Sequence, residues 1–218
     1  AERAVSRGLA SADVDGDGRL DLIVTNLSLE TNTLYLASGD GFRDATRGAG
    51  LFAPSYPVLG FGVDLVDLDL DGHLDLAVAN GHAVDNIEVF EAGLSYAQPS
   101  QLFANDGSGR FTDLGAAAGP GFAERAVSRG LASADVDGDG RVDLLVTRTN
   151  AAALLLRNET AQPGHWLGLR LVDRRGSPVV LGARVEVRAG GRSLLRHTRS
   201  GGSFLSQSAL ALHFGLGT

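Results

Sequence analysis

Aspartates at alternate positions form three acidic loops whose spacing suits the binding of a metal ion. The loop aspartates are Asp13, Asp15, Asp17 and Asp21; Asp67, Asp69, Asp71 and Asp75; and Asp135, Asp137, Asp139 and Asp143. Carboxylates at loop positions 1, 3 and 5 can converge on one ion, glycine at position 6 permits a sharp turn, and position 9 closes the cage. Six or so oxygens suit Ca²⁺ better than the smaller Mg²⁺. The loops therefore predict about three Ca²⁺ ions, one per loop.

Position 7 of each loop is expected to contribute its backbone carbonyl oxygen. Arg19, His73 and Arg141 occupy this position. An EF-hand is excluded, because it needs glutamate at position 12 and all three loops have valine there. The alternative to a metal site is a solvated turn, since Asp and Gly favour turns, but three loops in register favour the metal. We expect the ion to clamp a β-turn and to have no catalytic role.

The segments around the loops alternate apolar and polar residues between Gly, Asn and Asp turns, which is typical of β-strands. A short strand is expected before each loop, another directly after it, and a third beyond. The first two units have room for a fourth strand, whereas the third unit does not. We therefore predict an all-β fold built from repeated sheets.

Composition excludes several classes of protein and divides the chain in two. The 218 residues include no Cys, so disulfides, thiolate zinc sites and cysteine nucleophiles are absent. No apolar run is long enough for a transmembrane helix. Residues 1–150 contain 23 acidic groups and 10 arginines, a net charge of −13, whereas residues 151–218 contain 3 acidic groups and 9 arginines, a net charge of +6. Such asymmetry indicates two units with different roles.

The arginines after position 150 alternate with apolar residues, as on the exposed face of a strand, so nucleic acid is not an expected partner. A polyanion or an acidic partner is the alternative, and the acidic repeats of this same chain are one such acidic surface.

Few other residues have the pattern of an active site. Ser200, Ser203 and Ser206 lie near His197, but neither a Gly-x-Ser-x-Gly elbow nor a nearby aspartate accompanies them. The chain is therefore not expected to be an enzyme, and a secreted hydrolase whose active site lies in an absent or undetected segment is kept as an alternative.

Two regions are candidates for contact with other molecules. His165 and Trp166 begin the C-terminal part, and we expect them to pack its first strand rather than to stack on a ligand. The insert over 80–100 contains His82 and Asp85 and is the candidate partner-binding loop, with a plain exposed connection as the alternative.

The three loops resemble the calcium loops of FG-GAP/VCBS repeats, the blades of integrin-α-like β-propellers. Gly164-His165-Trp166, Gly182-Ala-Arg-Val-Glu-Val187 and His213-Phe-Gly-Leu-Gly217 are similar to segments of the ASPIC/UnbV domain. The pairing is characteristic of bacterial secreted proteins and of the cartilage acidic protein family. The resemblance implies a partial β-propeller of three blades and then a small, incomplete β-domain. The expected bounds are 1–52, 53–122 and 123–158 for the blades, within a 1–158 repeat region, and 159–218 for the β-domain.

The same resemblance implies a non-enzymatic, calcium-stabilised module that is secreted, periplasmic or on the cell surface. Its expected partners are proteins, or further segments of a longer chain, that cover the open blade edges, because a propeller needs at least about four blades to close. A carbohydrate-binding surface protein is the alternative, with glycans as the ligand. We expect the chain to be part of a longer protein.

Two stretches of the chain are almost identical. Residues 1–25 and 123–147 differ only at Leu20/Val142 and Ile23/Leu145, whereas the middle unit has diverged. Either a recent duplication or the reuse of one stretch explains this pattern.

Overall fold

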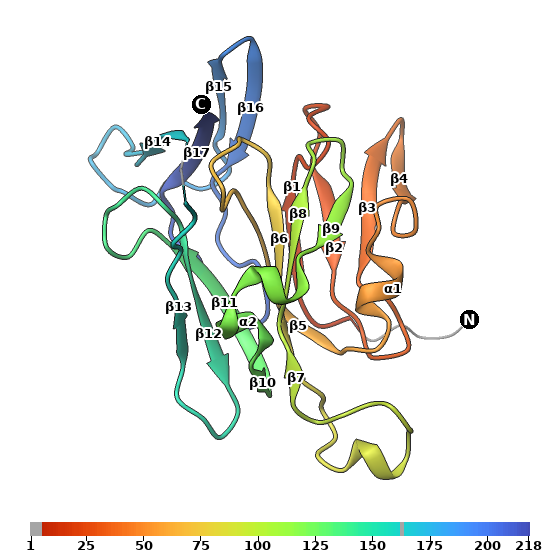
Figure 1. Ribbon diagram of the computed structural model, residues 1–218. Helices are drawn as coiled ribbons and strands as arrows, with labels where there is room; N and C mark the ends of the chain where they lie inside the picture. Colours follow the sequence, from red (N-terminus) through yellow and green to blue (C-terminus); the bar gives the residue numbers. More distant parts are fainter. Residues whose placement is uncertain (1–5, 162–163) are drawn as a thin grey trace.

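The computed structural model describes residues 6–161 and 164–218, and β-strands make up most of its regular structure (Figure 1). Three antiparallel sheets follow one another, each with its strands in sequence order. Sheet 1 consists of β1 (Leu9–Ala12), β2 (Asp21–Val24), β3 (Thr33–Ser38) and β4 (Gly41–Asp44). Sheet 2 consists of β5 (Gly60–Val66), β6 (Asp75–Asn80), β8 (Gln101–Asn105) and β9 (Phe111–Asp113). Sheet 3 consists of β11 (Ser128–Ala134), β12 (Asp143–Arg148) and β13 (Leu154–Leu156).

Short elements connect the sheets. Sheet 1 is followed by α1 (Phe52–Ser55), and sheet 2 is followed by η2 (Gly115–Ala118) and α2 (Pro120–Ala123). The insert between β6 and β8 contains η1 (Ile87–Val89) and β7 (Gln98–Pro99), and β7 pairs with β10 (Arg125–Ala126).

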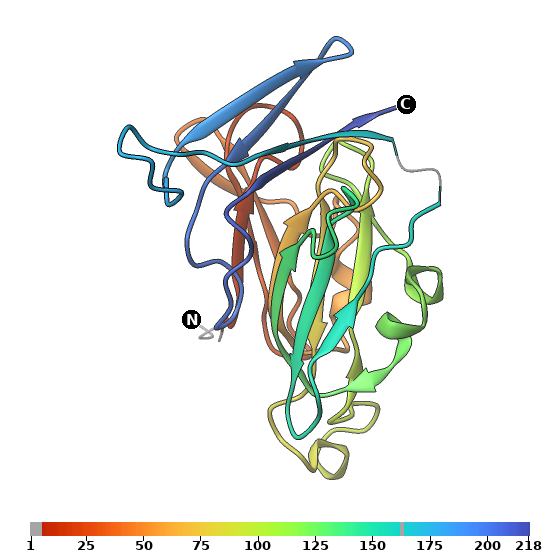
Figure 2. The same cartoon turned by 90° about the vertical axis from the view of Figure 1, so that its left-hand side faces the viewer.

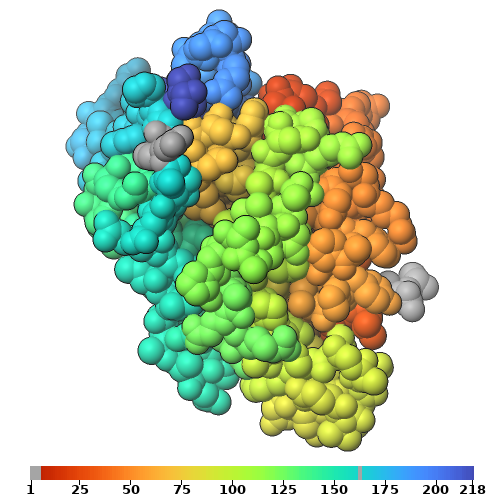
Figure 3. All heavy atoms as spheres, in the orientation of Figure 1, coloured from red at the N-terminus to blue at the C-terminus, as the bar shows by residue number. Residues whose placement is uncertain are grey.

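Two antiparallel ribbons form the C-terminal β-domain. The first pairs β14 (His165–Leu169) with β17 (Leu212–Gly217), and the second pairs β15 (Arg184–Ala189) with β16 (Arg192–His197). Its small core is centred on Leu194, Leu212 and Phe214. In the space-filling view the β-domain lies at the top of the molecule, against the ends of the sheets (Figure 3).

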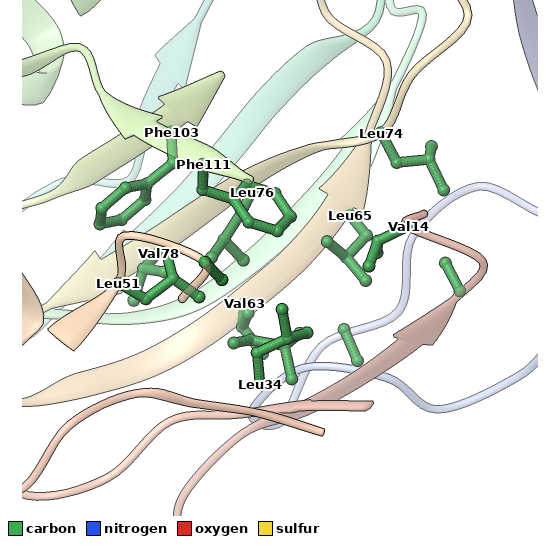
Figure 4. Packing of buried hydrophobic residues seen from close by; sticks show 14 of the residues in the cluster. Val14, Leu34, Leu51, Val63, Leu65, Leu74, Leu76, Val78, Phe103 and Phe111 are labelled. Carbon is green, nitrogen blue, oxygen red and sulfur yellow. The ribbon is translucent and has the colours of Figure 1, made fainter. Parts of the chain in front are cut away.

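Apolar side chains fill the two spaces between the three sheets. The first core brings Leu34 of sheet 1 against Val63 and Phe103 of sheet 2 (Figure 4). The second core brings Ala77 of sheet 2 against Leu144 of sheet 3. Because strand side chains alternate between the two faces, sheet 2 contributes to both cores, and every residue of β5 and β6 is buried.

This arrangement confirms the prediction of an all-β fold with a partial propeller. The first two units are four-stranded and the third is three-stranded. Among residues 6–161 and 164–218 the three sheets pack face to face without closing into a ring.

Residues 199–211 of the C-terminal β-domain run along the first strands of the sheets, between β1 and β11 (Figure 2). The Ser203 N–H donates to the Leu9 carbonyl oxygen of β1 at 2.8 Å, and the Val63 N–H of β5 donates to Ser203 Oγ at 3.0 Å. The Ala209 N–H donates to the Ser133 carbonyl oxygen of β11 at 2.9 Å. Since β1, β5 and β11 are the edge strands of their sheets, the segment satisfies backbone groups that would otherwise be open to pairing with another chain.

Asp64 of β5 ties this segment to the sheets through its side chain. Its carboxylate accepts hydrogen bonds from Ser133 Oγ at 2.6 Å, Ser208 Oγ at 2.7 Å and the Arg199 guanidinium at 3.1 Å. The Asp64 residue is only 4% exposed. A carboxylate buried to this degree needs these partners, because burial without them is costly.

Replacing Arg199 by alanine should lower the free energy of unfolding by about 2 to 4 kcal/mol, because Asp64 stays buried without its countercharge. Urea-induced unfolding followed by circular dichroism measures the change. The matched control is Arg174→Ala, which removes an exposed arginine of the same domain and should change the stability by less than about 0.5 kcal/mol. Equal effects of the two substitutions would contradict the role given to Asp64.

Candidate metal centres

Each acidic loop joins the first strand of its sheet to the second, so all three loops lie at the equivalent end of their sheets. Within the first loop, the Asp13 carboxylate accepts hydrogen bonds from the Gly16 and Gly18 N–H groups at 2.8 and 2.9 Å. Asp135 makes the same two bonds in the third loop. These bonds fold each loop around the carboxylate at position 1. Gly16 has a φ of 76°, in the left-handed region that glycine adopts at low cost.

The structure brings three carboxylates of each loop together, with one oxygen of each within 4.8 Å of the others. The groups are Asp13, Asp15 and Asp17; Asp67, Asp69 and Asp71; and Asp135, Asp137 and Asp143. Asp21, Asp75 and Asp139 lie outside these close groups. Like charges this close repel one another strongly, and a bound cation would offset the repulsion.

The aspartate at position 9 has a second role that the spacing alone did not reveal. In sheet 2, Asp75 accepts hydrogen bonds from the Leu68 N–H at 3.1 Å and from the Asn105 N–H at 3.0 Å, one on each oxygen. Asp21 and Asp143 make the equivalent pairs of bonds in their own units. Position 9 therefore braces the start of its loop against the end of the third strand, independently of any ion.

Burial makes several of these carboxylates costly to ionise. It raises the pKa of Asp75 to about 8, and the nearby charge of Asp69 adds to the effect. Burial likewise raises the pKa of Asp67 to about 6 and that of Asp21 to about 6. Backbone N–H donors oppose the shift at Asp75 and Asp21 without cancelling it. A cation nearby would act in the opposite direction, because it favours the charged form of each carboxylate.

Asp67 supplies the clearest test of whether the second loop fits a cation. Its residue is 2% exposed, and its Oδ1 is buried with no hydrogen-bond partner among the described residues. Its Oδ2 accepts from the Gly72 N–H at 3.0 Å and from the Gly215 N–H at 2.9 Å. The Arg196 guanidinium is 3.9 Å away, beyond hydrogen-bonding distance. An unpaired carboxylate oxygen beside two further aspartates offers oxygen ligands of the kind that a hard cation takes.

The side chains at position 7 differ between the loops. Arg19 contacts Asp17, and Arg141 contacts Asp139, so each arginine neutralises a carboxylate of its own loop at the surface. Exposed pairs of this kind contribute little to stability, about 0 to 1 kcal/mol. His73 instead places its ring against Gly107, where a Cβ would lie 2.3 Å from the ring.

The C-terminal β-domain packs directly on the acidic loops. Arg192 donates to the Asp71 carbonyl oxygen at 2.6 Å, and Arg196 donates to the Gly72 carbonyl oxygen at 3.2 Å. In the third loop, His213 Nε2 hydrogen-bonds the carbonyl oxygen of Gly140 at 2.7 Å. The sequence indicated the acidic repeats as one possible surface for the arginines, but nothing in the spacing of the arginines indicated these particular contacts.

A cavity of about 200 Å³ lies where the C-terminal β-domain meets the sheets, and Asp67, Arg196 and Trp166 are among the residues that line it. Small-molecule sites are usually about 300 to 1,000 Å³. The cavity is therefore sized for several water molecules beside the second loop rather than for a drug-sized ligand.

The other residues singled out by type make structural contacts. The ring of Trp166 stacks on that of His213, with centroids 5.7 Å apart, and His165 precedes it in β14. His82 is buried and hydrogen-bonds Ser28 and Val84.

The serines near His197 are also engaged with the backbone. Ser203 Oγ accepts from the Val63 N–H, and Ser206 Oγ donates to the Phe204 carbonyl oxygen at 2.8 Å.

Comparison with known families gives two matches. A model described as an FG-GAP-like repeat matches residues 13–78 and 86–146, and a model described as ASPIC and UnbV matches residues 174–218. No curated protein matches the chain. In the part of the chain that the structure describes, no helix is long and apolar enough to cross a membrane.

Substituting Asp75 by alanine should destabilise the fold by about 2 to 4 kcal/mol even when all divalent cations are chelated, because two buried N–H groups lose their acceptor. The comparison is Asp69→Ala, which removes an exposed carboxylate of the same loop and in chelator should change the stability by less than about 1 kcal/mol. Chemical unfolding in excess chelator measures both. Equal losses would mean that position 9 is not a separate brace.

Proposed function

The chain belongs to the FG-GAP-like repeat family, and from this premise we propose that it is a calcium-stabilised, extracytoplasmic module that binds other proteins and has no catalytic activity. The calcium ions would be held by the close aspartate groups of the three loops. Each ion would neutralise the aspartates of its loop and coordinate their oxygens. The loop would thereby stay folded between the first two strands of its sheet.

The unpaired Oδ1 of Asp67 carries the calcium proposal. At about 5 Å and an effective dielectric constant of about 20, each pair of like charges costs about 3 kcal/mol. A backbone hydrogen bond contributes only about 1 kcal/mol, so the loop's own hydrogen bonds do not offset three such repulsions. A divalent cation with oxygen preference removes the repulsion and supplies the missing partner of Asp67.

The exposure of the loops supports an extracytoplasmic location. Asp69 is exposed, and Asp17 forms an ion pair with Arg19. Both features weaken the attraction for calcium, so the affinity for each ion is expected to be moderate. Extracellular calcium modules have dissociation constants of about 10⁻⁴ to 10⁻³ M, and such sites fill only where calcium is abundant.

The insert between β6 and β8 is the surface that we propose for protein partners. Val89, at the end of η1, and Phe90, directly after it, are 78% and 68% exposed, and Val84 is also exposed. Glu88 and Glu91 flank these apolar side chains. A partner with an apolar patch rimmed by basic residues would complement this surface.

Removing calcium with a chelator should lower the melting temperature by roughly 10 °C, and restoring calcium should reverse the change. At a tenfold excess over the dissociation constant, each ion contributes about 1.4 kcal/mol, and 1 kcal/mol corresponds to about 2 to 4 °C for a domain of this size. Differential scanning fluorimetry with chelator, Ca²⁺ and Mg²⁺ measures the effect. Superimposed curves in chelator and in Ca²⁺ would refute the calcium proposal.

Asp67→Ala should remove one calcium ion from the stoichiometry measured by isothermal titration calorimetry and leave the other two loops able to bind. The control is Asp40→Ala, which removes an exposed acidic residue outside the loops and should leave the stoichiometry unchanged. An unaltered stoichiometry for Asp67→Ala would show that the Asp67 carboxylate is not a ligand.

A further inference from the structure

One asparagine side chain joins the first acidic loop to the second. The Nδ2 group of Asn105, the last residue of β8, donates to the Val14 carbonyl oxygen at 2.9 Å and to the Leu74 carbonyl oxygen at 3.0 Å. Val14 belongs to the first loop and Leu74 to the second. Asn105 is only 5% exposed, and its Oδ1 accepts from the Gly107 N–H at 3.0 Å. One buried amide group therefore holds carbonyl groups of two neighbouring loops.

A second asparagine makes the same bridge between the second loop and the third. The Nδ2 group of Asn158 donates to the Leu68 carbonyl oxygen at 2.7 Å and to the Val142 carbonyl oxygen at 3.2 Å. Its Oδ1 accepts from the Thr160 N–H at 3.0 Å. Ala37 occupies the equivalent place in sheet 1, because in each unit this residue's N–H donates to the aspartate at position 9. In the part of the chain that the structure describes, asparagine thus stands at this place only where there are two loops to join.

The bridged carbonyl groups lie directly beside the residues that are expected to bind calcium. In the earlier loop of each pair, the asparagine holds the residue at position 2, which lies between the close aspartates of positions 1 and 3. In the later loop it holds the residue at position 8, which lies between position 7 and the aspartate at position 9. An ion that orders one loop therefore also fixes one end of a bridge, and the fixed amide restrains the neighbouring loop.

Other contacts connect the same segments to the loops. In the turn between β8 and β9, a Cβ at Gly109 would lie 3.3 Å from the Asp15 side chain, so this turn packs on the first loop. Directly before Asn158, Arg157 forms an ion pair with Asp137 of the third loop at 2.7 Å. Each asparagine thus belongs to a segment that is already in contact with one of the loops it joins.

We propose that Asn105 and Asn158 are positioning residues that couple the three loops, so that calcium bound in one loop raises the calcium affinity of the next. This inference rests on the proposed calcium sites and extends them. The close carboxylates of an empty loop repel one another, so the first ion must order its loop. A bridged neighbour then binds its ion with part of the ordering already done. Coupling between binding sites commonly changes an affinity by about 5- to 150-fold.

The test is a thermodynamic cycle on the full chain, with Ca²⁺ as the probe and isothermal titration calorimetry as the measurement. The second loop is bridged on both sides, and the paired substitution Asp69→Ala and Asp71→Ala disables it by removing two expected ligands. In the otherwise wild-type chain this change should lower the affinity of the first and third loops at least about 5-fold. In a chain that also carries Asn105→Ala and Asn158→Ala, it should leave those affinities unchanged within about twofold, as for independent sites.

The variants include their own controls. Alanine at the bridge positions suits the fold, since Ala37 stands at the same place in sheet 1, and far-ultraviolet circular dichroism checks that each variant is folded. Asn105→Ala alone should uncouple only the first loop and leave the third coupled to the second. The matched control is Asn80→Ala, because the buried Asn80 amide donates to Pro99 and Gln101 within its own unit. In this variant the coupling should persist.

A general loss of stability would weaken calcium binding equally with and without a working second loop, so it would not imitate a loss of coupling. Coupling that is absent from the wild type, that persists without both bridging asparagines, or that is lost in Asn80→Ala would overturn the inference. Failure of the calcium proposal has a different result, because the wild-type chain would then bind no calcium at all.

Discussion

The carboxylate of Asp67 is buried where the repeats and the C-terminal β-domain meet, and its negative charge must be stabilised there. Its Oδ2 accepts one hydrogen bond from the loop, at Gly72, and one from β17, at Gly215. A side chain at position 215 would lie 2.3 Å from this oxygen, so only glycine allows the close approach. The docking of the domain and the order of the second loop consequently depend on the same buried carboxylate, and a cation that stabilises its charge would stabilise both.

The division of charge along the chain is explained in part by contacts inside the molecule. The first 150 residues carry a net charge of −13 and the remainder +6. Arg192 and Arg196 of β16 lie on the second acidic loop, and Arg199 pairs with buried Asp64. The basic C-terminal part therefore meets the acidic repeats of its own chain, one of the acidic surfaces that the sequence had indicated as partners.

The sequence predicted the strands and the acidic loops because both depend on local spacing. Alternation identifies strands, and aspartates at positions 1, 3 and 5 bring their side chains together within one turn in the first two loops. The brace made by Asp75 was missed because its donor at Asn105 is 30 residues away. The contacts of residues 199–211 could not be predicted either. Their partners in β1, β5 and β11 are far away in the sequence, and the periodicity of a strand does not indicate such long-range pairing.

The near-identical stretches show why a pattern of alternation cannot by itself identify the buried face. Leu9 and Leu131 have the same neighbours in sequence, yet one is 46% exposed and the other 1%. Both faces of these strands carry alanine, leucine, isoleucine or valine, so neither sheet is polar enough on one side to fix its orientation toward solvent. Such two-sided strands are typical of sheets covered on both faces, as β5 and β6 are here. The open faces of sheets 1 and 3 therefore have the composition of interior surfaces, and their exposure follows from the place of each sheet in the stack rather than from its sequence.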